Sequence, residues 1–192
     1  LHRLFPNAKI LIVIRNQYDL IESLYRQYIH EGGVRSFRDF VNYRSGGFQL
    51  SFCDMGFSIN PKMLNFLGLV NYYVERFGRE HVLVLPFESF KNDREGFLKK
   101  LYSWLGLSSF PKLSSQIRNQ GFGGRQIVIA RFLNRYLKSA FNEEAMIPDV
   151  NLPLTGKIDT GKLRVIVQSS LSRKLLGQKP ITDSEVKASV KK

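Results

Sequence analysis

Two runs of consecutive apolar residues constrain the fold of this chain more than any other feature. They are KILIVI at residues 9–14 and HVLVLPF at residues 81–87. Continuous runs rich in Val, Ile and Leu are typical of parallel strands covered on both faces, whereas half-exposed strands alternate polar and apolar residues. Parallel strands need a long crossover between them, which is usually helical. The two runs therefore predict an α/β fold with a parallel sheet.

Four other segments carry apolar residues at the three- and four-residue spacing of a helix. Their expected boundaries are Gly32 and Gly33 after the first, a Ser36 cap before the second, Pro61 and Gly78 around the third, and Gly106 after the fourth. The order of strand, helices, strand and helix is that of a parallel sheet with right-handed crossovers. Because two strands do not make a stable sheet, we expect its other strands upstream of residue 1.

The charge of the chain favours an anionic partner. Its 192 residues include 29 Lys and Arg against 16 Asp and Glu, which gives a formal net charge of +13. Such a surface attracts nucleic acid, phosphorylated cofactors, anionic glycans or anionic membranes, and charge alone does not choose among them.

Cysteine usage and hydropathy exclude several classes of protein. Cys53 is the only cysteine, which rules out an internal disulfide and gives no support for a cysteine-based metal site. No run of 18 apolar residues is present, so the sequence does not predict a membrane span. A lone cysteine fits a reducing compartment, and we expect a cytoplasmic protein, with a membrane anchor upstream of residue 1 as the alternative.

The pattern is weaker in the C-terminal half, which we expect to be rich in helices. Basic amphipathic helices are predicted at residues 123–141 and 161–176, and a short capped helix is predicted from Thr182. We predict one domain over residues 1–178, followed by a basic tail with that short helix over residues 179–192.

The segment GKIDTGKL at residues 156–163 nearly matches a phosphate-binding P-loop. Leu163 stands where binding of Mg²⁺ requires Ser or Thr, and the preceding NLPLT is a poor strand. We therefore interpret this match as chance.

Arg15 ends the first apolar run, and a helical pattern begins directly after it. In open α/β sheets, ligands bind beyond the carboxyl ends of the strands, where an arginine and the free N–H groups of a helix N-terminus can hold phosphate. Ser23, eight residues after Arg15, could turn its hydroxyl to the same anion. The alternative is a surface pair between Arg15 and Asp19, with Ser23 an ordinary helix residue, and both interpretations remain open.

Two segments of the chain resemble the sulfotransferase family. PNAKILIVIRNQYDLIESLYRQY at residues 6–28 resembles the motif that binds the 3′-phosphate of the sulfate donor 3′-phosphoadenosine 5′-phosphosulfate (PAPS). In that motif a strand ends in Arg-Asn-Pro, an acidic residue follows, and a serine comes eight residues after the arginine. YYVERFGREHVLVLPFESFKNDREGFLKKLYSWLGL at residues 72–107 resembles the later strand of the family, its Tyr-Glu-Asp turn and its helix ending in Leu-Gly.

This resemblance implies a fold and a set of ligands. The fold would be a three-layer parallel sheet of the P-loop-NTPase-like type, with the N-terminal part of the sheet preceding residue 1. Arg15 and Ser23 would hold the 3′-phosphate of PAPS. Arg125, in NQGFGGRQ at residues 119–126, would stand in for a late element of glycines and a basic residue that touches the nucleotide phosphates in relatives.

The chain departs from the family pattern at several positions. Gln17 replaces the proline of Arg-Asn-Pro, Phe87 replaces the tyrosine of Tyr-Glu-Asp, Glu88 is kept, and Ser89 takes the third, acidic position. The family's glycine-rich loop for the 5′-phosphosulfate has no counterpart in this sequence, and we expect that loop upstream of residue 1.

The implied function is sulfuryl transfer from PAPS to a hydroxyl or amine of a glycan, lipid or small molecule, without a metal. The chain would be a C-terminal portion of such an enzyme, inactive by itself. No catalytic base is assigned, since Glu22 is more simply a solvated partner of Arg26 at i+4 and His30 an exposed residue near its helix end. The alternatives are a P-loop-fold nucleotide kinase and a non-catalytic protein that binds polyanions; no specific nucleic-acid partner is expected.

Overall fold

The computed structural model describes residues 2–49, 59, 64–109, 122–137, 150–152, 156–158 and 184–190. The chain divides into two compact units, the first made of Leu1–Gln17 and Lys62–Ile117 and the second of Tyr18–Pro61 and Arg118–Lys192. The predicted helix at residues 161–176 lies outside the described residues.

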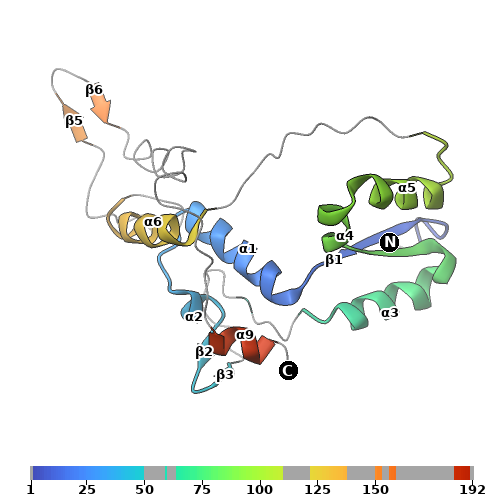
Figure 1. Cartoon of the computed structure of the whole chain (residues 1–192), viewed down its shortest axis with the longest axis horizontal. Coiled ribbons are helices and arrows are strands. Elements are labelled where there is room, and N and C mark those ends of the chain that lie inside the picture. Colours follow the sequence, from blue (N-terminus) through green and yellow to red (C-terminus); the bar gives the residue numbers. More distant parts are fainter. Residues whose placement is uncertain are drawn as a thin grey trace. The chain divides into compact units, whose positions relative to one another are not determined.

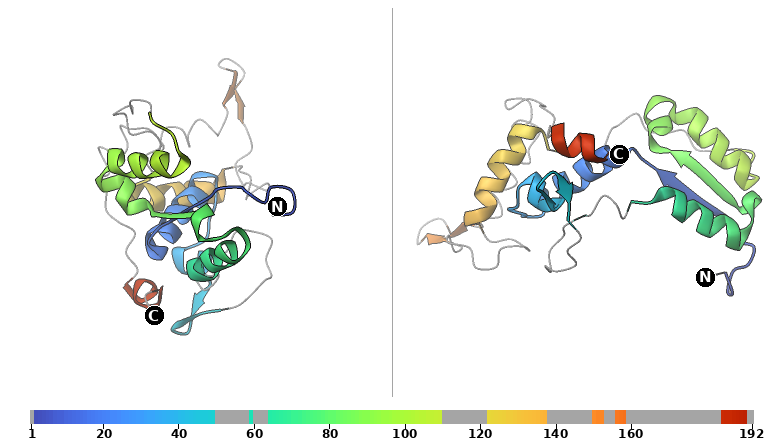
Figure 2. Two further views of the ribbon diagram at one scale, coloured as in Figure 1. Left: turned by 90° about the vertical axis from the view of Figure 1, so that its right-hand side faces the viewer. Right: turned by 90° about the horizontal axis from the view of Figure 1, so that it is seen from below.

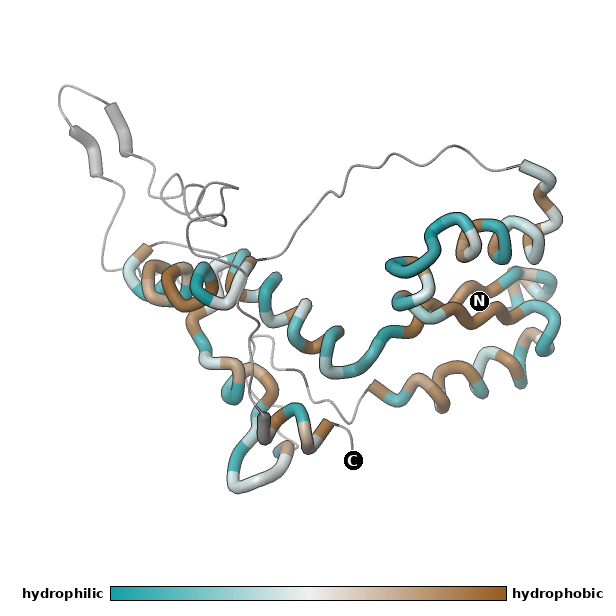
Figure 3. The backbone as a smooth tube through the Cα atoms, in the orientation of Figure 1, coloured by the Kyte–Doolittle hydropathy of each residue, from teal (hydrophilic) through white to brown (hydrophobic). Residues whose placement is uncertain are grey.

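The first unit is built on the two apolar runs. Strand β1 (Ile10–Ile14) pairs in parallel with strand β4 (Val82–Pro86), in a register that runs from Ile10 opposite Val82 to Ile14 opposite Pro86. Figure 3 shows hydrophobic residues along both strands. The prediction of an α/β fold with parallel strands is confirmed, and within the described residues the sheet has these two strands.

Helices lie on both sides of this sheet (Figure 1, Figure 2). They are α3 (Phe66–Phe77), the 3-10 helix η2 (Arg79–His81), α4 (Phe87–Asn92) and α5 (Arg94–Leu105). Helix α3 packs on one face through a core of Ile12, Phe77 and Val82. Trp104 of α5 donates its indole N–H to the carbonyl of Glu80 at 3.1 Å, which fixes α5 to η2, just before β4.

The second face of the sheet is covered unevenly. Leu85 of β4 is 2% exposed, whereas Leu11 and Val13 of β1 are 40% and 45% exposed. The prediction that the first strand is covered on both faces is therefore wrong for β1 within the described part of the chain. Its continuous apolar run has the composition of a buried strand, but only one face is packed here.

Helix boundaries follow the capping signals with one correction. Gly78 and Gly106 end α3 and α5 as predicted, with positive φ angles of 85° and 79° that suit glycine. Helix α3 begins at Phe66 and not near Pro61, because the side chain of Asn65 accepts the N–H of Gly68 at 2.9 Å and caps the helix there.

The second unit is mainly helical. Its elements are α1 (Gln17–His30), α2 (Phe37–Phe40), β2 (Tyr43–Arg44), β3 (Gly47–Phe48), α6 (Gly124–Tyr136), β5 (Val150–Leu152), β6 (Gly156–Ile158) and α9 (Ser184–Val190). The first residue of α1, Gln17, belongs to the first unit, and the rest of the helix belongs to the second. The rings of Tyr25, Tyr28, Phe37 and Phe40 pack together at centroid distances of 5.1 to 6.3 Å. Helix α2 has the predicted cap, since Ser36 accepts the N–H of Asp39.

The end of α1 is held by a buried amide. Asn134 of α6 is 1% exposed and donates its Nδ2 to the carbonyls of Ile29 and Gly33, at 2.8 and 2.9 Å. The carbonyl of Ile29 lies in the last turn of α1 and also accepts the N–H of Gly32 at 3.1 Å, whereas Gly33 lies just beyond the helix. Asn134 thus joins α1 to α6, and α1 ends at the predicted pair of glycines.

The C-terminal predictions are partly corrected. The basic helix predicted at residues 123–141 is α6, which ends at Tyr136, and the helix predicted from Thr182 begins at Ser184. Val186 of α9 is fully buried, and Lys187 lies 5.4 Å from the ring of Tyr18. Within the described residues, no helix is both long enough and apolar enough to cross a bilayer.

Candidate functional site

Arg15 lies at the carboxyl end of the parallel sheet in the first unit. Because Ile14 pairs with Pro86, the residues that follow the two strands, Arg15 and Phe87, come out at the same edge. The Arg15 guanidinium carbon lies 5.1 Å from the centroid of the Phe87 ring. The buried Nε of Arg15 has no hydrogen-bond partner in the described part of the chain. A buried guanidinium N–H without a partner is costly, and an anionic ligand would satisfy it.

Glu88 holds the backbone next to Arg15. Its Oε1 accepts the backbone N–H of Asn16 at 3.0 Å, a contact that joins positions 72 residues apart. Asn16 directly precedes α1, so its N–H is not part of the intrahelical hydrogen bonding. The carboxylate of Glu88 therefore fixes the turn between β1 and α1 to the first turn of α4.

These contacts keep Glu88 ionised. The N–H of Asn16 is the main cause that lowers the pKa of Glu88 below its usual value of 4.5, and the backbone N–H of Glu88 itself and the charges of Arg15 and Lys91 act in the same direction. Within the described residues of this unit, the carboxylate is bound to backbone N–H groups and does not form an ion pair with Arg15. The guanidinium thus keeps its charge and its donors.

A second cation shares the aromatic platform. The Nζ of Lys91 lies 5.4 Å from the centroid of the same Phe87 ring, and Lys91 is exposed. A cation above an aromatic face is attracted by the ring, by about 0.5–1 kcal/mol at an exposed position. Phe87, which replaces the tyrosine of the family turn, therefore holds two positive charges at the strand ends.

Gln17 has a contact that a proline could not make. Its Nε2 donates to the carbonyl of Leu64 at 2.7 Å, which ties the first residue of α1 to the segment that precedes α3. Gln17, which replaces the family proline, thus holds the turn after β1 through a hydrogen bond that proline cannot form.

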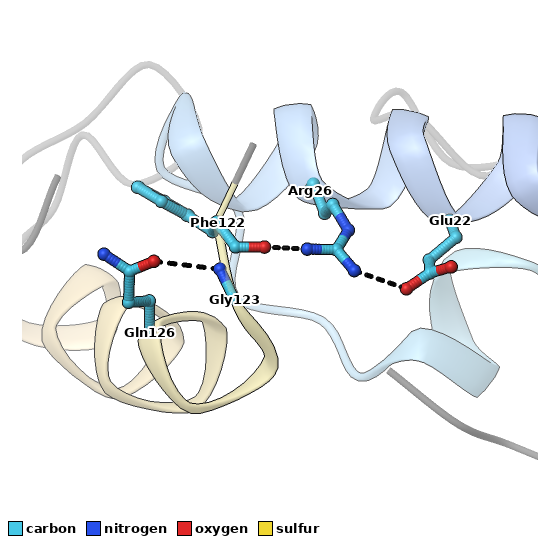
Figure 4. Close-up of polar contacts among 5 residues, drawn as sticks. All are labelled: Glu22, Arg26, Phe122, Gly123 and Gln126. Atoms are coloured by element: carbon cyan, nitrogen blue, oxygen red, sulfur yellow. Dashed lines mark hydrogen bonds and ion pairs between the residues drawn. The ribbon is translucent and has the colours of Figure 1, made fainter. Parts of the chain in front are cut away.

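In the second unit, Arg26 joins α1 to the start of α6 (Figure 4). One guanidinium nitrogen donates to the carbonyl of Phe122, and the other pairs with Glu22 Oε1 at 2.5 Å. The Arg26 and Glu22 side chains are only 24% and 16% exposed. The side chain of Gln126 accepts the N–H of Gly123 at 2.8 Å and caps α6. The glycine-rich start of α6 is therefore fixed to the middle of α1.

The predicted ligands divide between the two units. Ser23 is half-buried on α1, next to Glu22, and Arg125 is the exposed second residue of α6. Both helices belong to the second unit, where the contacts of Arg26 join them. Arg15 belongs to the other unit. Binding of one phosphate by Arg15 and Ser23, and the alternative pair of Arg15 with Asp19, both stay predictions.

The expectation for His30 is confirmed, and that for Glu22 is confirmed for its partner but not for its exposure. Glu22 pairs with Arg26 as its i+4 spacing predicts, although the pair is more buried than a solvated pair on a helix surface. His30 is exposed, and its ring lies 5.3 Å from the ring of Phe122.

The position of Lys91 next to the Phe87 ring was not predicted from the sequence. Lys91 comes four residues after Phe87, the spacing that brings two side chains to the same face of a helix. The spacing would have predicted a contact between Lys91 and Phe87, but it gave no sign that Arg15 lies against the same ring. The hydrogen bond between Glu88 and Asn16 joins distant segments, so only the strand register reveals it.

Comparison with known proteins identifies the family. A model of the sulfotransferase family matches residues 1–112. Among solved structures, a sulfotransferase from Alicyclobacillus acidocaldarius is similar at 25% sequence identity and a TM-score of 0.46, over 62% of this chain and 48% of that one. This chain therefore spans about half the length of that structure, and no curated protein matches it. Because the family match covers more than half of its 192 residues, the chain belongs to the sulfotransferase family.

Proposed function

We propose that this chain binds the nucleotide of PAPS and contributes to transfer of its sulfuryl group to a hydroxyl or amine acceptor, which can be a glycan, a lipid or a small molecule. Arg15 binds the 3′-phosphate. The observation that carries this proposal is the buried Nε of Arg15, which has no partner among the described residues while the nearby carboxylate of Glu88 is bound to Asn16. A phosphate supplies the acceptor that this arginine lacks.

Ser23 and Arg125 enter the proposal through the resemblance to the family. Ser23 donates its hydroxyl to the same 3′-phosphate, and Arg125 adds positive charge to the nucleotide phosphates. Sulfuryl transfer also needs positive charge at the bridging phosphate and a base at the acceptor, for the same reasons as phosphoryl transfer. We assign neither group to a residue of this chain.

Calorimetric titration with adenosine 3′,5′-bisphosphate tests the proposal. Charge-assisted hydrogen bonds contribute about 1.5–3 kcal/mol, so Arg15→Ala should weaken binding by roughly 10- to 100-fold. Adenosine 5′-monophosphate, which lacks the 3′-phosphate, should bind the wild type and this variant equally.

Arg76 offers a matched control for this substitution. It lies over the ring of Tyr72 at 4.5 Å, on a helix that leads to the amino end of β4, the opposite end of the strand from Phe87. Arg76→Ala should leave the affinity unchanged. Equal losses for Arg15→Ala and Arg76→Ala, or preferential binding of ATP with Mg²⁺, would contradict the proposal.

A double-mutant cycle tests the role of Ser23. If Arg15 and Ser23 bind one phosphate, the combined loss of affinity in Arg15→Ala,Ser23→Ala will differ from the sum of the two single losses. Independent losses, or no loss for Ser23→Ala, would remove Ser23 from the site and leave the assignment of Arg15 intact.

A further inference from the structure

We propose that Glu88 is a positioning residue for the 3′-phosphate site: its carboxylate holds the backbone of Asn16, and so places Arg15 without neutralising it. This inference rests on the proposed function, since it concerns the arginine that binds the 3′-phosphate. It assigns no contact between Glu88 and the ligand.

The first argument comes from the end of the sheet. The last pair in the register joins Ile14 to Pro86, and a proline has no N–H to donate to the neighbouring strand. The regular hydrogen bonding between the main chains therefore weakens just before Arg15. Glu88, two residues after Pro86, reaches back to the N–H of Asn16 at 3.0 Å and continues the connection through its side chain.

The second argument comes from the placement of Arg15 between two attachments. On one side its guanidinium lies 5.1 Å from the centroid of the Phe87 ring, and on the other its neighbour Asn16 is bound to Glu88. Phe87 and Glu88 are consecutive residues at the start of α4. One turn of helix thus fixes both the side chain and the backbone at the arginine, and groups that orient a ligand-binding residue in this way commonly decide its affinity.

The third argument concerns charge. Glu88 faces two cations in this unit, Arg15 and Lys91, and its carboxylate is engaged by backbone N–H groups. An ion pair between Glu88 and Arg15 would occupy guanidinium N–H groups that a phosphate needs. Glu22 occupies an N–H group of Arg26 in this way in the other unit. The geometry at Glu88 avoids that competition, and the site keeps an excess of positive charge.

Two conservative substitutions separate reach from charge. Glu88→Gln keeps the length of the side chain and an oxygen that can accept the N–H of Asn16, but it removes the charge. Glu88→Asp keeps the charge, but the shorter side chain no longer reaches Asn16. Glu95, which is exposed on α5, is a matched control in which the change of Glu to Asp touches no part of the site.

The first measurement is amide hydrogen exchange at Asn16 without ligand. Protection of this N–H should be lost in Glu88→Asp and kept in Glu88→Gln and Glu95→Asp. Equal protection of Asn16 in Glu88→Asp and the wild type would overturn the inference without affecting the proposed function.

The second measurement is the ratio of affinities for adenosine 3′,5′-bisphosphate and adenosine 5′-monophosphate. Glu88→Asp should lower this ratio by about 10-fold, the size of effect typical for residues that orient a ligand-binding group, while Glu88→Gln retains it within about threefold. A purely structural role would weaken binding of both nucleotides and leave the ratio unchanged, which would overturn the inference.

The failure of the proposed function gives a different result. If Arg15→Ala does not change the ratio of the two affinities, the 3′-phosphate site is wrong and the role of Glu88 falls with it. If Arg15→Ala lowers the ratio and Glu88→Asp does not, only the inference about Glu88 is overturned.

Discussion

Each unit has an arginine with a glutamate near it, Arg26 with Glu22 in the second unit and Arg15 with Glu88 in the first, and the contacts of the two arginines differ. In the second unit, Arg26 and Glu22 form a direct ion pair at 2.5 Å, and Arg26 also binds the carbonyl of Phe122. In the first unit, Glu88 binds the N–H of Asn16, while the Nε of Arg15 is buried without a partner among the described residues. The guanidinium of Arg26 is therefore bound within the protein, whereas that of Arg15 has a buried N–H without a partner among the described residues.

This difference suits Arg26 to a structural role and agrees with the proposed binding role of Arg15. Burying a guanidinium is costly unless its donors are satisfied, so an arginine with complete internal contacts contributes to folding and has little left for a ligand. An arginine whose donors are incomplete contributes to folding less and gains more from an anion. We expect substitutions at Arg26 to change stability and substitutions at Arg15 to change binding.

The largest expected effect is the loss of stability in Arg26→Ala. This change removes the ion pair with Glu22 and the hydrogen bond to the carbonyl of Phe122 in a mostly buried place, which should cost about 2–3 kcal/mol of the free energy of unfolding. Arg15→Ala should cost less than about 1 kcal/mol, because it removes the contact with the Phe87 ring but no hydrogen bond within the described part of the chain. Urea denaturation of both variants measures the difference.

Peptide-resolved hydrogen exchange assigns that loss to a unit. In Arg26→Ala the faster exchange should be confined to α1 and α6. The double variant Glu22→Ala,Arg26→Ala should lose less stability than the sum of the two single changes, since the two side chains interact directly. Equal destabilisation by Arg15→Ala and Arg26→Ala would contradict the distinction between the two arginines.

A smaller loss of stability is expected from the buried amide of Asn134, the other tie between α1 and α6. Asn134→Ala removes the Nδ2 donor from the carbonyls of Ile29 and Gly33, and the carbonyl of Ile29 keeps the N–H of Gly32, so the change should cost about 2 kcal/mol. Asn134→Asp has nearly the same shape but turns a carboxylate oxygen toward those carbonyls, and it should be worse than Ala. Thermal unfolding compares the two variants, and a milder effect of Asp than of Ala would mean that the hydrogen bonds do not carry the contact.

Much of the first unit could be predicted from the sequence because its signals are local. The apolar runs gave both strands, and glycines at positions 78 and 106 gave two helix ends. The start of α3 was misplaced because two signals competed, and the Asn65 cap decided where the helix begins. The exposure of Leu11 and Val13 was not predictable from composition, since it depends on which faces the neighbouring elements cover.

The candidate site was predictable only in part for the same reason. Arg15 was found because it follows a strand directly, and the end of a strand is a local property. The contacts of Glu88 with Asn16 and of Arg26 with Phe122 join residues that are 72 and 96 positions apart, and only the tertiary arrangement brings them together. Sequence patterns therefore identified Arg15 as a candidate binding residue but not the contact of Glu88 with the neighbouring Asn16.

The next expected effect distinguishes the units at alkaline pH. Burial raises the pKa of Tyr25 above its usual value of 10.0, and the hydrogen bond and charge of Arg131 oppose this shift only in part. A group with a raised pKa contributes stability that is fully present below its unfolded pKa and is lost as the pH rises through its folded pKa. The second unit should therefore lose stability above about pH 10.

Tyr25→Phe tests this expectation. The variant loses the hydrogen bond of the hydroxyl to the carbonyl of Arg35 at 3.0 Å, so its stability at neutral pH should fall slightly. Its stability should then decline less steeply than that of the wild type between pH 9.5 and 11, a range set by the usual tyrosine pKa of about 10. Parallel declines of the two proteins would exclude Tyr25 as the cause.

The smallest expected effect is the response of the first unit to acid, which has the opposite sign. The N–H of Asn16 lowers the pKa of Glu88 below 4.5, so this carboxylate contributes stability that is present above the unfolded pKa and is lost as the pH falls through the lower, folded pKa. Glu88→Gln should flatten the acid limb of stability below about pH 4.3, and added salt should reduce the difference because the group is partly exposed. Carboxyl NMR titration of Glu88 reports the folded pKa directly. If Asn16→Pro, which removes the N–H donor, leaves the pKa of Glu88 unchanged, the hydrogen bond to Asn16 is not the cause of the lowered pKa.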